Sequence, residues 1–291
     1  MKTVLIRSAL SLCLLLAALP AVAEERITRF HATLTLENNG DLLVREEIAV
    51  NAEQAEIKRG IYRDLNILVP QTFGLLRAPL EVIEVTRNGQ PEPWHFAFQG
   101  QDRRIYIGQK NTTLPQGHYT YTLTYRMGWQ VRRFADYDEL YWNVTGNNWS
   151  FPIDSANVSL SLPPGSSFDQ YSAYAGRKGT AGVEGQDYAL DVAGTQLTAR
   201  SLRPLVQGEG LTIAAGFLKG TIPQPDGAAW RALLLQYNAQ VMICSIGLLV
   251  LLAYYTFGWF SVGRDPGAGP VMPTRRPTYS PAAMRYVRRM G

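Results

Sequence analysis

The sequence predicts a mainly β protein, in which an antiparallel β-sandwich domain is joined to one transmembrane α-helix near the C-terminus. Many short segments between residues 31 and 217 alternate apolar and polar side chains with the period of a half-buried strand. Turn-forming Gly, Asn and Pro residues separate these segments, and no charged residue occurs from Ala232 to Gly263. The 291 residues are 46% hydrophobic, enough to bury a sizeable core, which excludes a disordered protein.

The first 23 residues have the three-part pattern of a secretory signal peptide. Lys2 and Arg7 form a short basic start, an apolar run extends from Ala9 to Leu19, and small residues end the segment at Ala23. This apolar run is too short to cross a bilayer. We therefore expect residues 1–23 to be a signal peptide, with a retained signal anchor as the alternative.

Residues 24–222 are expected to form the β-sandwich. The segment Asn38–Asp41 predicts a hairpin turn, because Asn and Gly tolerate the positive φ of a tight turn. No helical period intervenes between the strands, which favours a sandwich over a βαβ sheet. A pause at residues 152–155 leaves open a division into two lobes. The alternating segments are His31–Glu37, Asp41–Val50, Glu81–Arg87, Arg104–Ile107, Tyr119–Arg126, Leu140–Val144, Asn157–Leu162, Tyr188–Val192, Gln196–Leu202 and Leu211–Phe217.

A short linker, residues 223–231, is expected to lead into a transmembrane helix over residues 232–260. The core of this helix, Val241–Phe260, has 20 residues. At about 1.5 Å per residue it reaches about 30 Å, the thickness of the hydrocarbon layer, so we expect it to contact the lipid bilayer directly. Tyr and Trp residues near both ends are placed as in the aromatic belts of membrane proteins.

The two ends of the chain carry its basic excess. The formal net charge of +4 and the pI near 9.0 would suit a nucleic-acid-binding protein, but residues 24–260 are mildly acidic. We therefore expect no nucleic-acid partner. The segment 261–291 is basic, and by the positive-inside rule it lies in the cytoplasm. Anionic lipid is a further partner to consider for its arginines, which are Arg264, Arg275, Arg276, Arg285, Arg288 and Arg289.

Cysteine and histidine usage limits the chemistry of the domain. Cys13 lies in the expected signal peptide and Cys244 in the expected span, so residues 24–222 contain no disulfide and no cysteine metal site. The three histidines are far apart in the sequence and show no ligand spacing. We expect no metal and no cofactor.

Two segments carry a family resemblance. They are Lys58-Arg59-Gly60-Ile61-Tyr62-Arg63-Asp64 and the stretch 138–153, which contains Asn143-Val144-Thr145-Gly146-Asn147-Asn148-Trp149. In order and spacing they resemble the domain-of-unknown-function 2207 (DUF2207) family of predicted bacterial membrane proteins. The resemblance implies an exported β domain, a membrane anchor and a cytoplasmic segment, and it implies no activity.

The signal peptide would export the β domain, and the arginines after the span place the C-terminus in the cytoplasm, so two separate arguments predict one topology with one span. Together with the resemblance to a bacterial family, they lead us to expect the bacterial inner (plasma) membrane and a periplasmic N-terminal domain. Members of the family are longer, with further hydrophobic segments beyond the first cytoplasmic region. This chain ends at Gly291, so we expect either a shortened member or a truncated piece of a longer protein.

A carboxylate cluster is the one candidate for catalysis. Asp136, Asp138 and Glu139 lie within four residues of each other, beside Tyr141 and Trp142, and paired carboxylates near aromatic residues are what glycoside hydrolysis requires. Carboxylates next to arginines more often form a solvated loop, and alternate carboxylates also suit Ca²⁺. Catalysis by this cluster is therefore the less favoured hypothesis.

The aromatic segment 141–149 favours binding instead. Tyr141, Trp142 and Trp149 offer flat faces on which sugar rings stack, and Asn143 supplies directional hydrogen bonds. Core packing competes, because strand alternation places Tyr141 and Asn143 on one face and Trp142 on the other.

Tyr62 and Arg63 form a second binding candidate. An arginine beside a tyrosine can hold an acidic group of a ligand. An internal ion pair of Arg63 with Asp64 or Glu46 is the commoner arrangement.

The sequence therefore predicts a membrane-anchored module outside the cytoplasm that binds or scaffolds at the cell envelope, with an envelope protein or glycan as its partner. The alternative is an envelope hydrolase acting on glycans through the carboxylate cluster.

Overall fold

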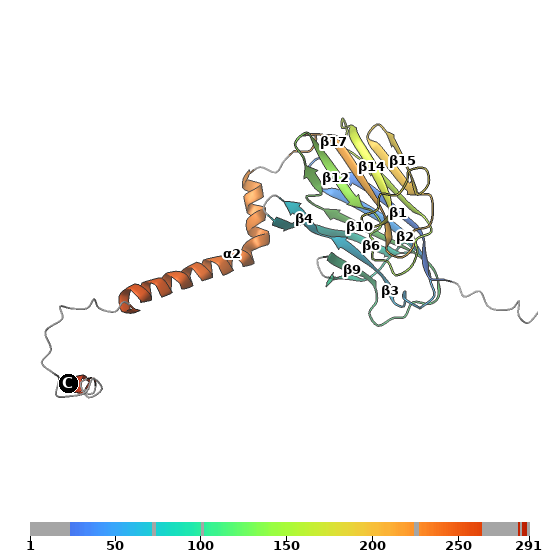
Figure 1. The fold of residues 1–291 in the computed structure, drawn as a ribbon. Coiled ribbons are helices and arrows are strands. Elements are labelled where there is room, and N and C mark those ends of the chain that lie inside the picture. The colour runs from blue at the N-terminus through green and yellow to red at the C-terminus, as the bar shows by residue number, and fades with distance from the viewer. Residues whose placement is uncertain are drawn as a thin grey trace, which may run out of the picture. The chain divides into compact units, whose positions relative to one another are not determined.

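The computed structural model describes residues 24–71, 74–99, 102–223 and 227–263, together with residues 285 and 287–289. The expected signal peptide and most of the basic segment 261–291 lie outside these residues. The chain divides into two compact units, Met1–Trp230 and Arg231–Gly291. The first is built of strands and the second contains most of a long helix, which confirms the predicted fold class (Figure 1).

The largest sheet has eight strands and forms one wall of the β domain. The predicted turn at Asn38–Asp41 joins its strands Arg26–Leu36 and Leu42–Ala52, and the amide of Asp41 donates to Asn39 Oδ1 at 3.0 Å. In the order of their hydrogen bonding, the strands are β15 (Tyr188–Ala193), β16 (Gln196–Ser201), β13 (Ala156–Ser161), β1 (Arg26–Leu36), β2 (Leu42–Ala52), β10 (Gly117–Met127), β6 (Leu80–Arg87) and β7 (Gln90–Pro91).

One pair in this sheet is parallel, and local sequence patterns could not show it. β1 and β13 run in the same direction with Phe30 opposite Ala156, and the chain enters this pairing through a bridge between Ile27 and Ile153. Strands from both sides of residues 152–155 thus share one sheet.

Three smaller sheets complete the domain. A four-stranded antiparallel sheet contains, in order, β11 (Val131–Arg133), β12 (Tyr137–Asn143), β17 (Glu209–Leu218) and β14 (Phe168–Arg177). A three-stranded sheet contains β3 (Gly60–Asn66), β9 (Asp102–Gly108) and β8 (Trp94–Gln99), and β4 (Leu68–Gln71) pairs with β5 (Gly74–Arg77).

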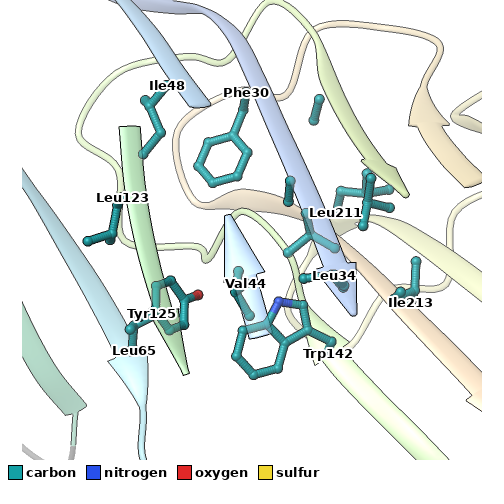
Figure 2. Close-up of a cluster of buried hydrophobic side chains, with 14 of the residues drawn as sticks. Phe30, Leu34, Val44, Ile48, Leu65, Leu123, Tyr125, Trp142, Leu211 and Ile213 are labelled. Carbon is teal, nitrogen blue, oxygen red and sulfur yellow. The ribbon is translucent and has the colours of Figure 1, made fainter. Parts of the chain in front are cut away.

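The core lies between the large sheet and the smaller ones. Alternate residues of β1 and β2, such as Leu34 and Val44, point to the same side as Tyr125 of β10, and there they meet Trp142 of β12 and Leu211 of β17 (Figure 2). All of these side chains are buried. Removing apolar surface from water at about 25 cal/mol per Å² is the main force that holds the two layers together.

The helix α2 (Gly227–Gly258) is followed by a short π-helix, η1 (Trp259–Gly263). It begins inside the segment 223–231 expected to be a linker. Its part from Val241 to Gly263 has a mean hydropathy of 2.0 and none of it is buried, so by length and composition it can cross a membrane. Within the described residues it is the one helix with this property.

Candidate functional site

A charged residue occupies a core position on β2. Alternation directs Leu42, Val44, Ile48 and Val50 into the core, and Glu46 lies in the same register and is fully buried. Its carboxylate accepts hydrogen bonds from Nε and Nη2 of Arg63 on β3, each at 2.9 Å. A buried carboxylate without such a partner would be strongly destabilising, so the two residues depend on each other.

All five N–H groups of Arg63 have acceptors. Besides the two bonds to Glu46, Nη2 donates to the carbonyl of Val144 at 2.7 Å, and Nη1 donates to the carbonyls of Thr145 at 3.0 Å and Asp64 at 3.1 Å. Burial opposes the charge of Arg63, but the adjacent Glu46 outweighs it, so the pKa of the guanidinium lies above its ordinary value. The Tyr125 hydroxyl also donates to Glu46, at 2.8 Å.

This ion pair holds the loop that follows β12. The loop carbonyl of Thr145 accepts from both Arg63 and the indole Nε1 of Trp149, the latter at 2.8 Å. Gly146 has φ +74°, and a Cβ there would lie 2.6 Å from Nη1 of Arg63, so only glycine fits. The loop is therefore fixed from the inside of the protein.

Trp149 and Tyr62, two aromatic residues expected to bind a ligand, instead pack beside the loop that follows β12. Trp149 is buried and stacks with Tyr62 at a centroid distance of 6.1 Å. The guanidinium of Arg104 lies 3.9 Å over the ring of Tyr62, whose hydroxyl donates to the carbonyl of Asn148 at 3.2 Å. The rings of Tyr62 and Trp149 thus pack against neighbouring residues of the protein. All N–H groups of Arg63 donate to internal acceptors, so none is left for a ligand.

A cleft of about 640 Å³ opens beside the same loop. Its lining comes from β12, β14 and β17 of the four-stranded sheet, from the loop 143–148, from the turn after β14, and from the ends of β3 and β9. Tyr141 and Asn143 line it from the outer face of β12, where Tyr141 is 39% exposed. Trp142, between them, points into the core, as strand alternation predicts.

Basic side chains outnumber acidic ones in the lining of the cleft. Arg132, Arg177 and Lys178 contribute positive charge. Asp64 is held by Arg104 through two bonds of 2.6 and 2.7 Å, which balance its charge. Burial, with Asp64 as a smaller cause, raises the pKa of Asp102.

The carboxylate cluster does not converge on one point. Asp138 is fully buried and pairs with Arg133 at 2.6 Å, whereas Glu139 is on the opposite face of β12, 3.6 Å from Arg132. Asp136 is exposed in the preceding turn. Adjacent residues of a strand point to opposite faces, so Asp138 and Glu139 cannot act on the same bond. Among the described residues, no group of His, Cys, Asp or Glu could hold a metal ion.

Sequence patterns missed the acceptors of Arg63 in the loop and the basic and aromatic residues that complete the cleft. One signal for the ion pair was available, because Glu46 interrupts an otherwise apolar series at alternate positions of β2. Arg132, Tyr174 and Lys178 come from separate strands and turns, and no local pattern unites them.

Comparison with known sequences gives two matches. The N-terminal domain of a family described as "Predicted membrane protein (DUF2207)" matches residues 26–217. The uncharacterized protein YciQ of Escherichia coli (strain K12) is 38% identical over 161 residues, which cover 54% of this chain and 25% of YciQ. The chain thus corresponds to about a quarter of this relative's length.

Solved structures with partial similarity include yeast LTA4 hydrolase and a putative protease from Parabacteroides distasonis. Each covers 66% of this chain with a TM-score of 0.40, at 9% and 10% identity, and the chain covers 29% and 40% of them, respectively. Similarity at this level carries neither a fold nor an activity over to this chain.

Proposed function

The chain belongs to the DUF2207 family of predicted membrane proteins, and we propose that it is a membrane-anchored module that binds a component of the bacterial cell envelope. The observation that carries this proposal is the cleft of about 640 Å³ on the β domain, whose loop wall is fixed by the buried pair of Glu46 and Arg63. A wall that is already ordered loses little entropy when a ligand binds.

In this proposal the β domain lies outside the cytoplasm, and the helix holds it at the inner membrane. Arginines crowd the C-terminal side of the apolar stretch Val241–Gly263, which supports a cytoplasmic C-terminus. The pattern of residues 1–23 supports export of the domain.

Cysteine labelling tests this orientation. In a Cys244→Ser background, Ser167→Cys places a thiol on an exposed loop of the β domain, and Ser280→Cys places one beyond the span. On intact spheroplasts, an impermeant maleimide should label the first variant alone, and permeabilisation should add the second. The reverse pattern would exclude the proposed orientation.

Binding is favoured over glycoside hydrolysis by the predicted carboxylate cluster, because Asp138 and Glu139 point to opposite faces of β12. Asp138 lies in the core, and Asp64 is occupied by Arg104. Glu139→Gln should therefore not weaken ligand capture, whereas it would abolish turnover by a hydrolase that used the cluster.

In-cell photocrosslinking tests the site itself. A benzophenone amino acid replaces Tyr141 in the cleft, and the control variant carries it at Thr35, exposed on the outer face of β1. Adducts with envelope material should form from position 141 and not from position 35. Equal crosslinking from both positions, or none from 141, would contradict a ligand site in the cleft.

A further inference from the structure

Part of the floor of the cleft is a shallow trough at Gly210 and Thr212 of β17. Residues 211, 213, 215 and 217 of this strand point into the core, so residues 210, 212, 214 and 216 lie on its outer side. All four outer residues are small: Gly210, Thr212, Ala214 and Gly216. Gly210 and Thr212 are open to the cleft, whereas Ala214 is buried and the side chain of Gln170 covers Gly216.

Tyrosines flank this trough from both sides. Tyr141 of β12 pairs with Ala214, and Tyr174 of β14 pairs with Thr212. Their ring centroids are 6.4 Å apart, and the planes are inclined by 40°. Arg132 covers one face of Tyr141, so the exposed part of Tyr141 and the ring of Tyr174 remain for a ligand. Such rings suit a ligand with flat, weakly polar faces, which is the character of a sugar ring.

The walls beside these rings carry positive charge. The guanidinium of Arg132 lies 4.3 Å over the ring of Tyr141, and its ion pair with Glu139 is long, at 3.6 Å. Arg177 and Lys178, in the turn after β14, are exposed, and neither forms an ion pair within the described part of the chain. Arg177 and Lys178 are therefore available to interact with a ligand, whereas Arg132 already contacts Glu139 and Tyr141.

The acidic residues of the lining are fewer than its basic residues. Asp64 is neutralised by Arg104, and Asp102 interacts electrostatically with Lys178. The cleft is therefore complementary to a negatively charged ligand.

Directional polar groups are present as well. Asn143 Nδ2 donates to Asn147 Oδ1 at 2.7 Å, and Asn147 Nδ2 donates to the carbonyl of Gly208 at 3.2 Å. Each amide group has two N–H bonds, and these contacts use one of them, so one on each side chain remains for a hydroxyl of a ligand.

We infer that the cleft binds an acidic glycan, a chain of sugar rings that carries carboxylate or phosphate groups. This inference rests on the proposed envelope-binding function and names its ligand class. The rings would stack against Tyr141 and Tyr174, and the acidic groups would lie near Arg177 and Lys178.

Calorimetry on the full chain in zwitterionic nanodiscs tests the inference. The probes are an oligogalacturonate, an oligomannose phosphate of similar length, neutral maltoheptaose and polyglutamate. At least one of the two acidic glycans should bind, and maltoheptaose should bind at least tenfold more weakly. The two acidic probes distinguish carboxylate from phosphate as the recognised group, and raised salt should weaken binding.

Variants assign the binding to the cleft. Lys178→Gln and Arg177→Gln should each weaken acidic glycan binding several-fold, and Tyr141→Ala should weaken it at least tenfold. Lys110→Gln removes an exposed lysine outside the cleft and should change nothing. Unchanged unfolding midpoints show that each variant is folded.

Three results would overturn the inference. They are binding of neither acidic glycan, equal binding of maltoheptaose, and polyglutamate binding that survives Tyr141→Ala, which would show attraction to charge alone. If crosslinks still form from position 141 in cells, the ligand class is wrong and the proposed function stands. If those crosslinks are also absent, both fail.

Discussion

At the scale of single residues, the buried pair of Glu46 and Arg63 explains more of this domain than any exposed group. One charge comes from β2 of the large sheet and the other from β3 of the three-stranded sheet, so the pair joins two layers across the core. Because Arg63 also binds the carbonyls of Val144 and Thr145, the pair orders one wall of the cleft. A residue expected to bind a ligand thus supports the site from behind.

Removing one partner of this pair should be strongly destabilising. Arg63→Met leaves the carboxylate of Glu46 buried without its counter-charge, and the expected loss is about 3–5 kcal/mol in the free energy of unfolding. Urea unfolding of the detergent-solubilised chain, followed by tryptophan fluorescence, measures it. The double variant Glu46→Leu/Arg63→Met is the control and should lose less than the single variant. If the single and double variants lose the same unfolding free energy, the unpaired charge of Glu46 is not the cause of the loss.

Alkaline pH should weaken the domain through its buried tyrosines. Burial, with Glu46 as a smaller cause, raises the pKa of Tyr125 well above 10, and burial also raises the pKa of Tyr121. Below about pH 10 these tyrosine hydroxyls are protonated in both the folded and the unfolded state. Above about pH 10 they ionise in the unfolded state and stay protonated in the folded state. Stability should therefore fall as pH rises past about 10. Tyr121→Phe should flatten this decline, and an unchanged slope would contradict it.

At the scale of elements, the hairpin of β11 and β12 fastens the segment that leads to the helix. Arg133 Nη1 donates to Asp138 at 2.6 Å and to the carbonyl of Ile222 at 2.9 Å. The amide of Gly220 donates to Asp138 at 3.2 Å, and Nζ of Lys219 donates to the carbonyls at the hairpin turn. Part of the carboxylate cluster therefore has a structural role at the exit of the β domain.

Loss of this attachment should loosen residues 219–223. Arg133→Gln removes the donors to Ile222 and Pro223 and leaves Asp138 buried without its cation, so amide exchange should accelerate at Gly220 and Thr221. Hydrogen exchange read by mass spectrometry detects the change. Arg132→Gln, one residue away on the other face, is the matched control and should leave that segment protected. Equal exchange in the two variants would exclude the attachment.

At the scale of the whole molecule, a β domain with its own core and an apolar helix form separate units of one chain. The helix is apolar around its circumference from residue 241 onward and is exposed, which suits lipid rather than a protein interior. Among the described residues, this is the one helix that can cross a membrane by length and composition.

The basic C-terminal segment is expected to contact anionic lipid. A peptide of residues 264–291 should bind vesicles that contain phosphatidylglycerol, at about 1 kcal/mol for each arginine that reaches the surface. Replacing Arg275, Arg276, Arg288 and Arg289 by Gln should remove most of this binding in a sedimentation assay. Purely zwitterionic vesicles are the control. Equal binding of both peptides would leave orientation as the sole role of these arginines.

The sequence by itself determined ten of the strands, the turn at Asn38–Asp41, the apolar span and the alternation of residues 141–143 between two faces, because these depend on periodicity and on side chains close together in the chain. It missed strands β3, β8 and β14. Tertiary structure alone decided that β1 pairs in parallel with β13, that Arg63 pairs with Glu46 rather than with Asp64, and that Arg132, Tyr174 and Lys178 share one cleft with Tyr141. These contacts join residues far apart in the sequence. They depend on how complete sheets pack around one core, and a local sequence pattern does not specify this packing.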